Sequence, residues 1–178
     1  MTRWLKIFPR PRALFWSIAA VILLIDQTTK HWIETHMFIG QSIKVIDHFF
    51  YITYLQNEGV AFGFFGHAGN ALVGFLAFAI LLLGFWWTRD LDWKGREANI
   101  IGAMIFAGAV GNLIDRVRIG AVIDFLEFFL HFGPWRYEWP SFNVADSCIS
   151  SSVIYIIARI LTSGWIDSSR QKTKVKHD

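Results

Sequence analysis

The segment Ala98–Ile114, with the sequence ANIIGAMIFAGAVGNLI, contains no charged residue and is followed directly by Asp115 and Arg116. A helix that crosses a membrane needs about 20 mainly apolar residues, and this segment comes close to that length. It is also rich in small residues that let neighbouring helices approach closely: Gly102, Ala103, Ala107, Gly108, Ala109 and Gly111. We therefore interpret it as a membrane-spanning helix that packs against other helices.

Three more segments have a similar length and character: 13–33, 69–87 and 144–161. Of the 178 residues, 54% are hydrophobic, and the chain includes nine Trp and 17 Phe. A soluble domain of this size seldom carries so much apolar surface. The sequence therefore predicts a mainly α, polytopic membrane protein, in which residues 1–178 form a single membrane domain with four transmembrane helices.

Lys and Arg residues predict how the chain is oriented in the membrane. They are concentrated in the N-terminal tail, in the link 88–97 and in the tail 166–178, whereas the long segment 34–68 contains only Lys44. Because Lys and Arg gather on the cytoplasmic side, we expect both termini to be cytoplasmic and the segments 34–68 and 115–143 to face outward. This distribution also explains the net charge of +3. Since no basic patch is formed, we expect no nucleic-acid binding.

The two outer segments are patterned like folded structure. Residues Ile43–Leu55 are rich in the β-branched and aromatic residues that suit strands, which predicts a small extracytoplasmic β-sheet. In Val122–Phe132, apolar residues recur at spacings of three and four: Ile123, Leu126, Phe129 and Leu130. This spacing predicts a short interfacial helix at the membrane surface. We expect the tail after Trp165 to be disordered.

Ionisable residues stand near the outer ends of the predicted spans. An Asp or Lys at membrane depth costs about 2.5–3.5 kcal/mol, so each calls for a partner or a function. Asp26 and Lys30 lie four residues apart on one helical face, which predicts a buried ion pair, with a direct part in the chemistry as the alternative. Asp146 follows Asn143, the expected N-cap of the last span, by three residues. An acid there stabilises the start of a helix even without a catalytic role.

Two further groups allow both a structural and a functional interpretation. Gly108, Asn112 and Asp115 share one helical face and are followed by Arg116, which fits either a polar helix end or part of a site. Asp124 is an acid inside a hydrophobic stretch near the outer surface.

Four short motifs, together with Asp26 and Lys30, resemble those of one known family. They are NEGVAF (57–62), GNLIDR (111–116), VIDF (122–125) and FNVAD (142–146). Their order and their placement relative to the predicted spans are similar to those of lipoprotein signal peptidase, also called signal peptidase II, over about residues 13–161. One such fragment is a weak signal, whereas four in sequence are specific.

The resemblance implies an aspartic endopeptidase in the bacterial cytoplasmic (inner) membrane, with its active site near the outer face. It would remove signal peptides from prolipoproteins by cleaving before a diacylglyceryl-modified cysteine, without a cofactor or metal, as a monomer surrounded by membrane lipid. Asp124 and Asp146 would be the catalytic pair. Four residues would hold the substrate backbone and orient the pair: Asn57, Asn112, Arg116 and Asn143. Five would have supporting roles: Asp26, Lys30, Gly108, Asp115 and Ala145.

The residues also fit this chemistry on physical grounds. Two carboxylates in a poorly solvated site do not both ionise easily, so one keeps a proton while the other activates water. The six His never form the His-Glu-x-x-His motif of zinc proteases, and Ser–Lys catalysis would have only Lys30 and Lys44 on the outer side. A proton-coupled transporter and a membrane assembly factor without chemistry stay open as alternatives.

Overall fold

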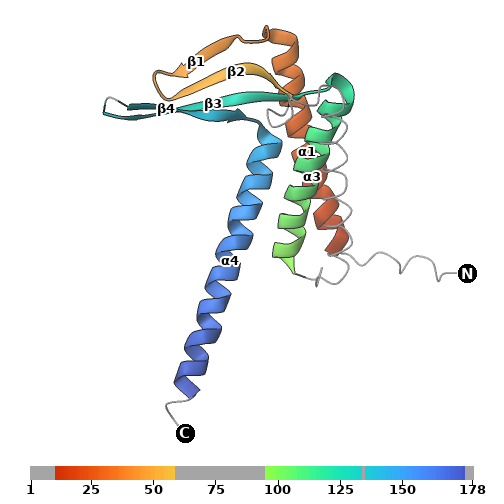
Figure 1. The fold of residues 1–178 in the computed structure, drawn as a ribbon. Coiled ribbons are helices and arrows are strands. Elements are labelled where there is room, and N and C mark those ends of the chain that lie inside the picture. The colour runs from red at the N-terminus through yellow and green to blue at the C-terminus, as the bar shows by residue number, and fades with distance from the viewer. Residues whose placement is uncertain (1–10, 59–94, 134, 175–178) are drawn as a thin grey trace, which may run out of the picture.

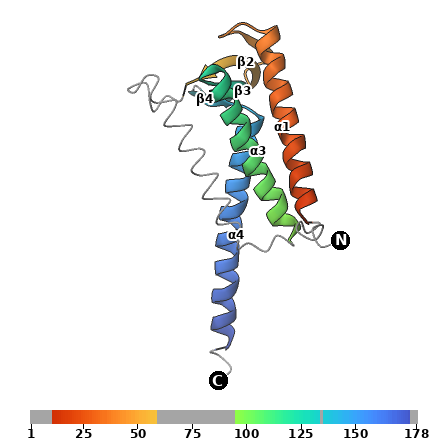
Figure 2. The same cartoon turned by 90° about the vertical axis from the view of Figure 1, so that its right-hand side faces the viewer.

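The computed structural model describes residues 11–58, 95–133 and 135–174, and this part of the chain contains three helices and one sheet. The helices are α1 (Pro11–His36), α3 (Arg96–Ile119) and α4 (Val144–Lys174). The strands are β1 (Ser42–Ile46), β2 (Phe50–Asn57), β3 (Val122–Phe132) and β4 (Trp135–Phe142). The sheet lies across one end of the helices (Figure 1), and α1 and α3 run side by side, as the turned view in Figure 2 also shows.

Two of the helices match predicted spans. α1 and α3 are each long and apolar enough to cross a membrane. They contain the predicted segments 13–33 and 98–114, which are confirmed as helices, and both extend further than predicted. α3 continues to Ile119, where Gly120 ends it with a φ of 77°, a left-handed conformation that glycine adopts readily. The predicted span 69–87 lies outside the described residues, so the total of four spans stays a prediction.

α4 begins at Val144, as the last predicted span does, but it continues to Lys174. The prediction that the tail after Trp165 is disordered is therefore wrong for residues 166–174. No proline interrupts this segment, and its Arg, Gln and Lys residues favour helix. Because adding a residue to an existing helix is much easier than nucleating one, the helix propagates beyond its apolar part.

The four strands form one antiparallel sheet in the order β1-β2-β3-β4. β1 and β2 confirm the sheet predicted in Ile43–Leu55. The interfacial helix predicted over Val122–Phe132 is wrong, because this segment is β3, which pairs with both β2 and β4. β3 has buried residues on both faces, so most of its side chains are apolar. The spacings of three and four residues between some of these apolar side chains resemble those of a helix only by coincidence. The ring of Phe128 instead stacks on those of Phe50 and Phe142 across the sheet.

Small residues bring the helices close together. Ala19 of α1 and Ala103 and Ala107 of α3 form a buried cluster. A Cβ atom at Gly108 of α3 would lie 2.6 Å from the carbonyl oxygen of Ala145, which is too close for a side chain. Glycine at this position therefore lets α3 contact the start of α4. A second core joins the end of α1 to the sheet: Ile33, Met37, Tyr54, Ile123 and Phe125.

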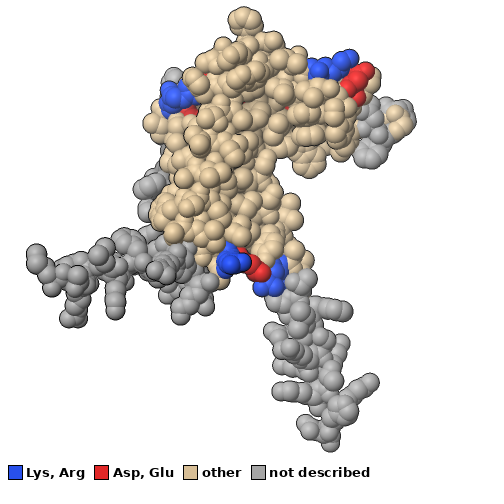
Figure 3. All heavy atoms as spheres, turned by 180° about the vertical axis from the view of Figure 1, so that it is seen from behind, with Lys and Arg blue, Asp and Glu red and all other residues tan. Residues whose placement is uncertain are grey.

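Charged side chains are grouped at the two ends of the described surface. On the face shown in Figure 3, they lie near the sheet and at the opposite ends of the helices, and the surface between them is uncharged. Surface ion pairs mark both ends, with Arg118–Glu34 and Lys44–Asp47 at the sheet end and Arg159–Glu97 at the other. An uncharged band of this kind suits the hydrocarbon core of a membrane.

Candidate active site

Asp124 of β3 and Asp146 of α4 are both bound to Asn143, the residue that precedes α4. The Asn143 Nδ2 group donates to Asp124 Oδ1 over 3.0 Å. The backbone N–H of Asn143 donates to Asp146 Oδ2 over 3.3 Å, and the backbone N–H of Asp146 donates to Asn143 Oδ1 over 2.9 Å. Asn143 thus caps α4 reciprocally with Asp146 and also ties Asp124 to this helix end. The capping role considered for Asp146 is confirmed, and the same contacts bring the two acids together.

Asp124 is buried, with 1% of its surface exposed. Its second oxygen, Oδ2, accepts a hydrogen bond from Asn57 Nδ2 over 2.9 Å. Burial raises the pKa of Asp124 to about 6, and the charge of Asp146 acts in the same direction, whereas the hydrogen bonds from Asn57 and Asn143 oppose the rise. A carboxyl group with such a pKa exchanges its proton near neutral pH, as acid–base catalysis requires.

Asn112 and Arg116 of α3 approach the acids from another side. Asn112 Nδ2 donates to Asp146 Oδ1 over 2.7 Å, and Asn112 Oδ1 accepts from Asn143 Nδ2 over 3.2 Å. Arg116 donates from Nη1 to the backbone carbonyl of Asn112 over 3.3 Å, and its charge acts on both Asp124 and Asp146. The structure therefore gathers four predicted residues around the acids: Asn57, Asn112, Arg116 and Asn143.

A cluster of ionisable residues adjoins this group. Lys30 is buried between Asp26 and Asp115, with its Nζ 2.9 Å from Asp26 Oδ2 and 2.8 Å from Asp115 Oδ2. The predicted Asp26–Lys30 pair is confirmed, and Asp115 is a further partner that the sequence did not indicate. Asp26 Oδ1 accepts from the backbone N–H of Ala145 over 2.9 Å, and Asp115 Oδ2 accepts from that of Ile123 over 3.2 Å. The cluster thereby fixes the residues directly before Asp146 and Asp124.

Gln27 belongs to this cluster, although it was not among the site residues predicted from the sequence. Its Nε2 group lies 3.1 Å from Asp26 Oδ2, 3.2 Å from the carbonyl oxygen of Gly111 and 3.4 Å from Asp115 Oδ1. A polar residue directly after Asp26 in an apolar span was the available signal. Gly111 is required here as well, since a Cβ atom at this position would lie 2.5 Å from Asp26 Oδ2.

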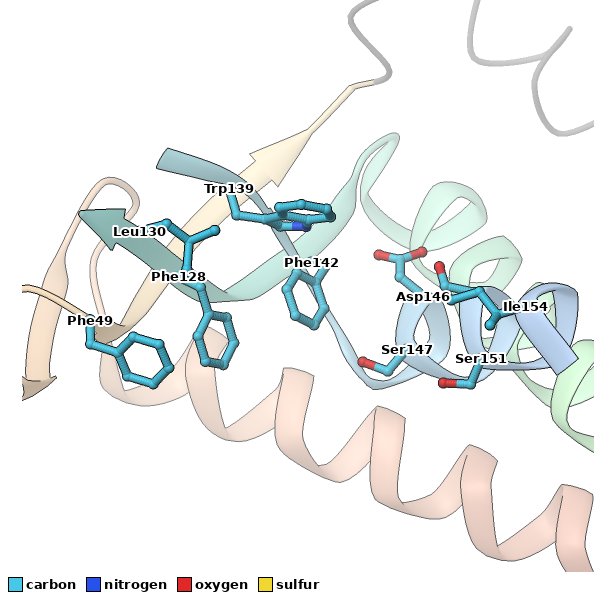
Figure 4. Close-up of a pocket in the computed structure, with 10 residues that line it drawn as sticks. Phe49, Phe128, Leu130, Trp139, Phe142, Asp146, Ser147, Ser151 and Ile154 are labelled. Atoms are coloured by element: carbon cyan, nitrogen blue, oxygen red, sulfur yellow. The ribbon is translucent and has the colours of Figure 1, made fainter. Parts of the chain in front are cut away.

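A pocket of about 560 Å³ lies between the sheet and α4, and Asp146 lines it. Figure 4 shows Asp146, Ser147 and Ser151 on α4 beside the aromatic side chains of the sheet. Most of the lining side chains are large and apolar: Phe49, Phe128, Leu130, Trp139, Phe142 and Ile154. The pocket therefore offers an apolar cleft with a carboxylate in its wall, an arrangement typical of binding sites.

The site can perform hydrolysis. The negative charge of Asp146 repels that of Asp124, so Asp124 holds a proton more readily than an isolated aspartate does. The ionised acid can then deprotonate a water molecule while the protonated acid donates to a carbonyl oxygen. Together with the apolar helices, this points to a membrane enzyme of the hydrolase class.

Comparison with known proteins identifies the family. The family described as signal peptidase (SPase) II matches residues 18–162. The lipoprotein signal peptidase of Syntrophus aciditrophicus is 37% identical over 156 residues, which cover 85% of this chain and 94% of that protein. That of Geobacter sulfurreducens is 43% identical over 143 residues, which cover 79% and 86%.

A solved structure agrees with these relatives. A bacterial membrane enzyme, determined by the in meso method at 2.3 Å resolution, has a TM-score of 0.73 and 35% sequence identity, and the match covers 84% of this chain and 88% of that one. This chain therefore belongs to the signal peptidase II family, a family of bacterial inner-membrane proteases that remove signal peptides from prolipoproteins. The resemblance drawn from the four motifs is confirmed.

Proposed function

We propose that this protein cleaves prolipoproteins before a diacylglyceryl-modified cysteine and that Asp124 and Asp146 are its catalytic pair. One observation carries the proposal: both carboxylates are held by the same residue, Asn143, and one of them, that of Asp146, lines an apolar pocket. The hydrogen bonds from Asn57 and Asn112 orient the pair. The apolar pocket suits the lipid-modified part of the substrate.

In the proposed mechanism, the two acids share one proton, and hydrolysis proceeds by moving this proton between water, the acids and the substrate. The ionised acid takes a proton from water, and the hydroxide adds to the scissile carbonyl carbon while the protonated acid protonates the carbonyl oxygen. The C–N bond then breaks as one acid gives its proton to the leaving amine, and a hydroxyl of the intermediate returns a proton to the pair. Arg116, whose charge acts on both acids, helps to offset the negative charge that the pair carries during the reaction.

The proposed orientation places the sheet end outside and both termini in the cytoplasm. The positions of the charged residues support it, because Arg159 and Glu97 lie at the end opposite the sheet and adjoin the Lys- and Arg-rich segments. The site would then meet its substrate at the outer leaflet.

Proton transport is less well supported. Among the described residues, the buried Asp, Glu and Lys side chains all belong to the sheet end: Asp26, Lys30, Asp115, Asp124 and Glu127. A proton path needs such groups through the depth of the bilayer.

The proposal is tested by Asp124→Asn and Asp146→Asn in the purified protein, with a diacylglyceryl-modified prolipoprotein peptide as substrate. Each variant should lower kcat by about a thousandfold or more, because the pair can no longer both take and give a proton. Asp47→Asn is the matched control, since Asp47 is exposed at the β1–β2 turn and pairs with Lys44 there. Normal cleavage by either dyad variant would remove that acid from the mechanism.

A further inference from the structure

The ammonium group of Lys30 contacts a third oxygen atom besides its two carboxylate partners. Its Nζ donates to Asn112 Oδ1 over 2.9 Å, while Asp26 and Asp115 take up the charge. Lys30 is 1% exposed, so these three protein oxygens stand where water would otherwise bind. An ammonium group has three donors, and each has an oxygen partner here.

The contact with Lys30 determines which way the Asn112 amide points. Asn112 Oδ1 accepts from Lys30 Nζ and from Asn143 Nδ2, and Asn112 Nδ2 donates to Asp146 Oδ1. In the flipped orientation, the Asn112 NH2 group would face two donors and its oxygen would face the Asp146 carboxylate. Both contacts would be repulsive, so a positive charge at Lys30 favours the orientation that gives Asp146 a hydrogen bond.

We infer that Lys30 is a positioning residue for the catalytic pair: it fixes the Asn112 amide so that Asn112 holds Asp146 in place. This inference rests on the proposed function, because it assigns Lys30 a role in the same site. Lys30 does not touch the substrate in this account, and it acts on the reaction through Asn112. Its charge also acts on Asp124 through space, and the experiment has to separate the two routes.

Replacing Lys30 alone is a poor test, since it would leave two buried carboxylates without a counter-charge and destabilise the fold. The triple variant Asp26→Asn/Lys30→Met/Asp115→Asn avoids this, because the Asn oxygens can still accept from the backbone N–H groups of Ala145 and Ile123. The variant removes the ammonium donor while keeping side chains of similar size. Lys44→Met is the matched control at an exposed lysine of the sheet end.

The experiment measures kcat, KM and melting temperature for the wild type, the triple variant, Asn112→Ala and their combination, with the diacylglyceryl-modified peptide. The triple variant should fold and lose on the order of 10- to 100-fold in kcat with little change in KM, because the pair is misplaced rather than the substrate site. In the Asn112→Ala background the same triple change should lower kcat no further.

Three results would overturn the inference. One is a folded triple variant with the kcat of the wild type. Another is an equal loss of kcat in the Asn112→Ala background, which would show that Lys30 acts through space on Asp124. If the triple variant does not fold, Lys30→Arg is measured in its place, because Arg keeps the charge but cannot place a single donor where the ammonium group stood. The third overturning result is a kcat for Lys30→Arg equal to that of the wild type. A wild type that does not cleave the peptide would instead refute the proposed function.

Discussion

At the residue scale, the two acids of the pair differ in their surroundings. Asp124 is buried and accepts hydrogen bonds from two side-chain amides, those of Asn57 and Asn143. Asp146 lines the pocket between the sheet and α4. The two acids therefore combine one shielded carboxyl group with one that borders the pocket.

Asn57→Ala should raise the pKa of Asp124 above its present value of about 6. The Asn57 amide donates to the carboxylate and so favours the charged form; without it, the proton binds more tightly. At pH 6 a larger fraction of Asp124 should then be protonated. The carbonyl stretch of the protonated carboxyl group measures this by infrared spectroscopy, as a difference spectrum against Asp124→Asn. Gln56→Ala is the control on the same strand, since Gln56 donates to Tyr54. An unchanged or lowered pKa in Asn57→Ala would contradict the account.

The sequence located much of the site at this scale, because motif residues fall on positions that the fold brings together. The contacts that cross the chain were harder to predict. Gln27 reaches a carbonyl oxygen 84 residues away and a carboxylate 88 residues away, and no local pattern marks such a partner. The Asp26–Lys30 pair could be predicted because its residues are only four apart in the sequence. The contact of Lys30 with Asp115 could not, because the two residues lie far apart in the sequence.

At the element scale, glycines on α3 set the distance to the neighbouring helices. Gly108→Ala and Gly111→Ala should each destabilise the protein by about 1–3 kcal/mol, since the new methyl group would collide with the Ala145 carbonyl oxygen or with the Asp26 carboxylate. Both obstacles are held in place, one by the backbone and one by the ion pair with Lys30.

Thermal unfolding in detergent measures this effect. Val117→Ala is the control on the same helix, because Val117 is 81% exposed and should change the melting temperature little. A melting temperature for Gly108→Ala equal to that of the wild type would mean that α3 and α4 are not in direct contact in solution.

The apolar helices α1 and α3 were predictable from their sequences, and the strand state of β3 was not. α1 and α3 each contain an apolar sequence long enough to cross a membrane, so a helix was predicted for both. The first residues of β3, from Val122 to Phe125, are buried on both faces, so the alternation that identifies a half-exposed strand is absent there. Its strand state depends on pairing with β2, which lies far earlier in the sequence, and with β4, which follows it directly.

At the scale of the whole molecule, the charged ends predict the orientation. In a Cys148→Ser background, Asp47→Cys should react with a membrane-impermeant maleimide added to intact spheroplasts, because Asp47 is exposed at the sheet end. Arg159→Cys, at the opposite end, should react only after the membrane is permeabilised. Reaction in the reverse pattern would place the sheet in the cytoplasm.

Whether Asp124 and Asp146 act as one pair can be seen in an experimental structure with a bound peptide analogue that carries a hydroxyl group in place of the scissile carbonyl. We expect this hydroxyl to lie within about 3 Å of a carboxyl oxygen of each acid, between the sheet and α4. A hydroxyl that contacts neither acid, or only one of them with the other turned away, would contradict this expectation.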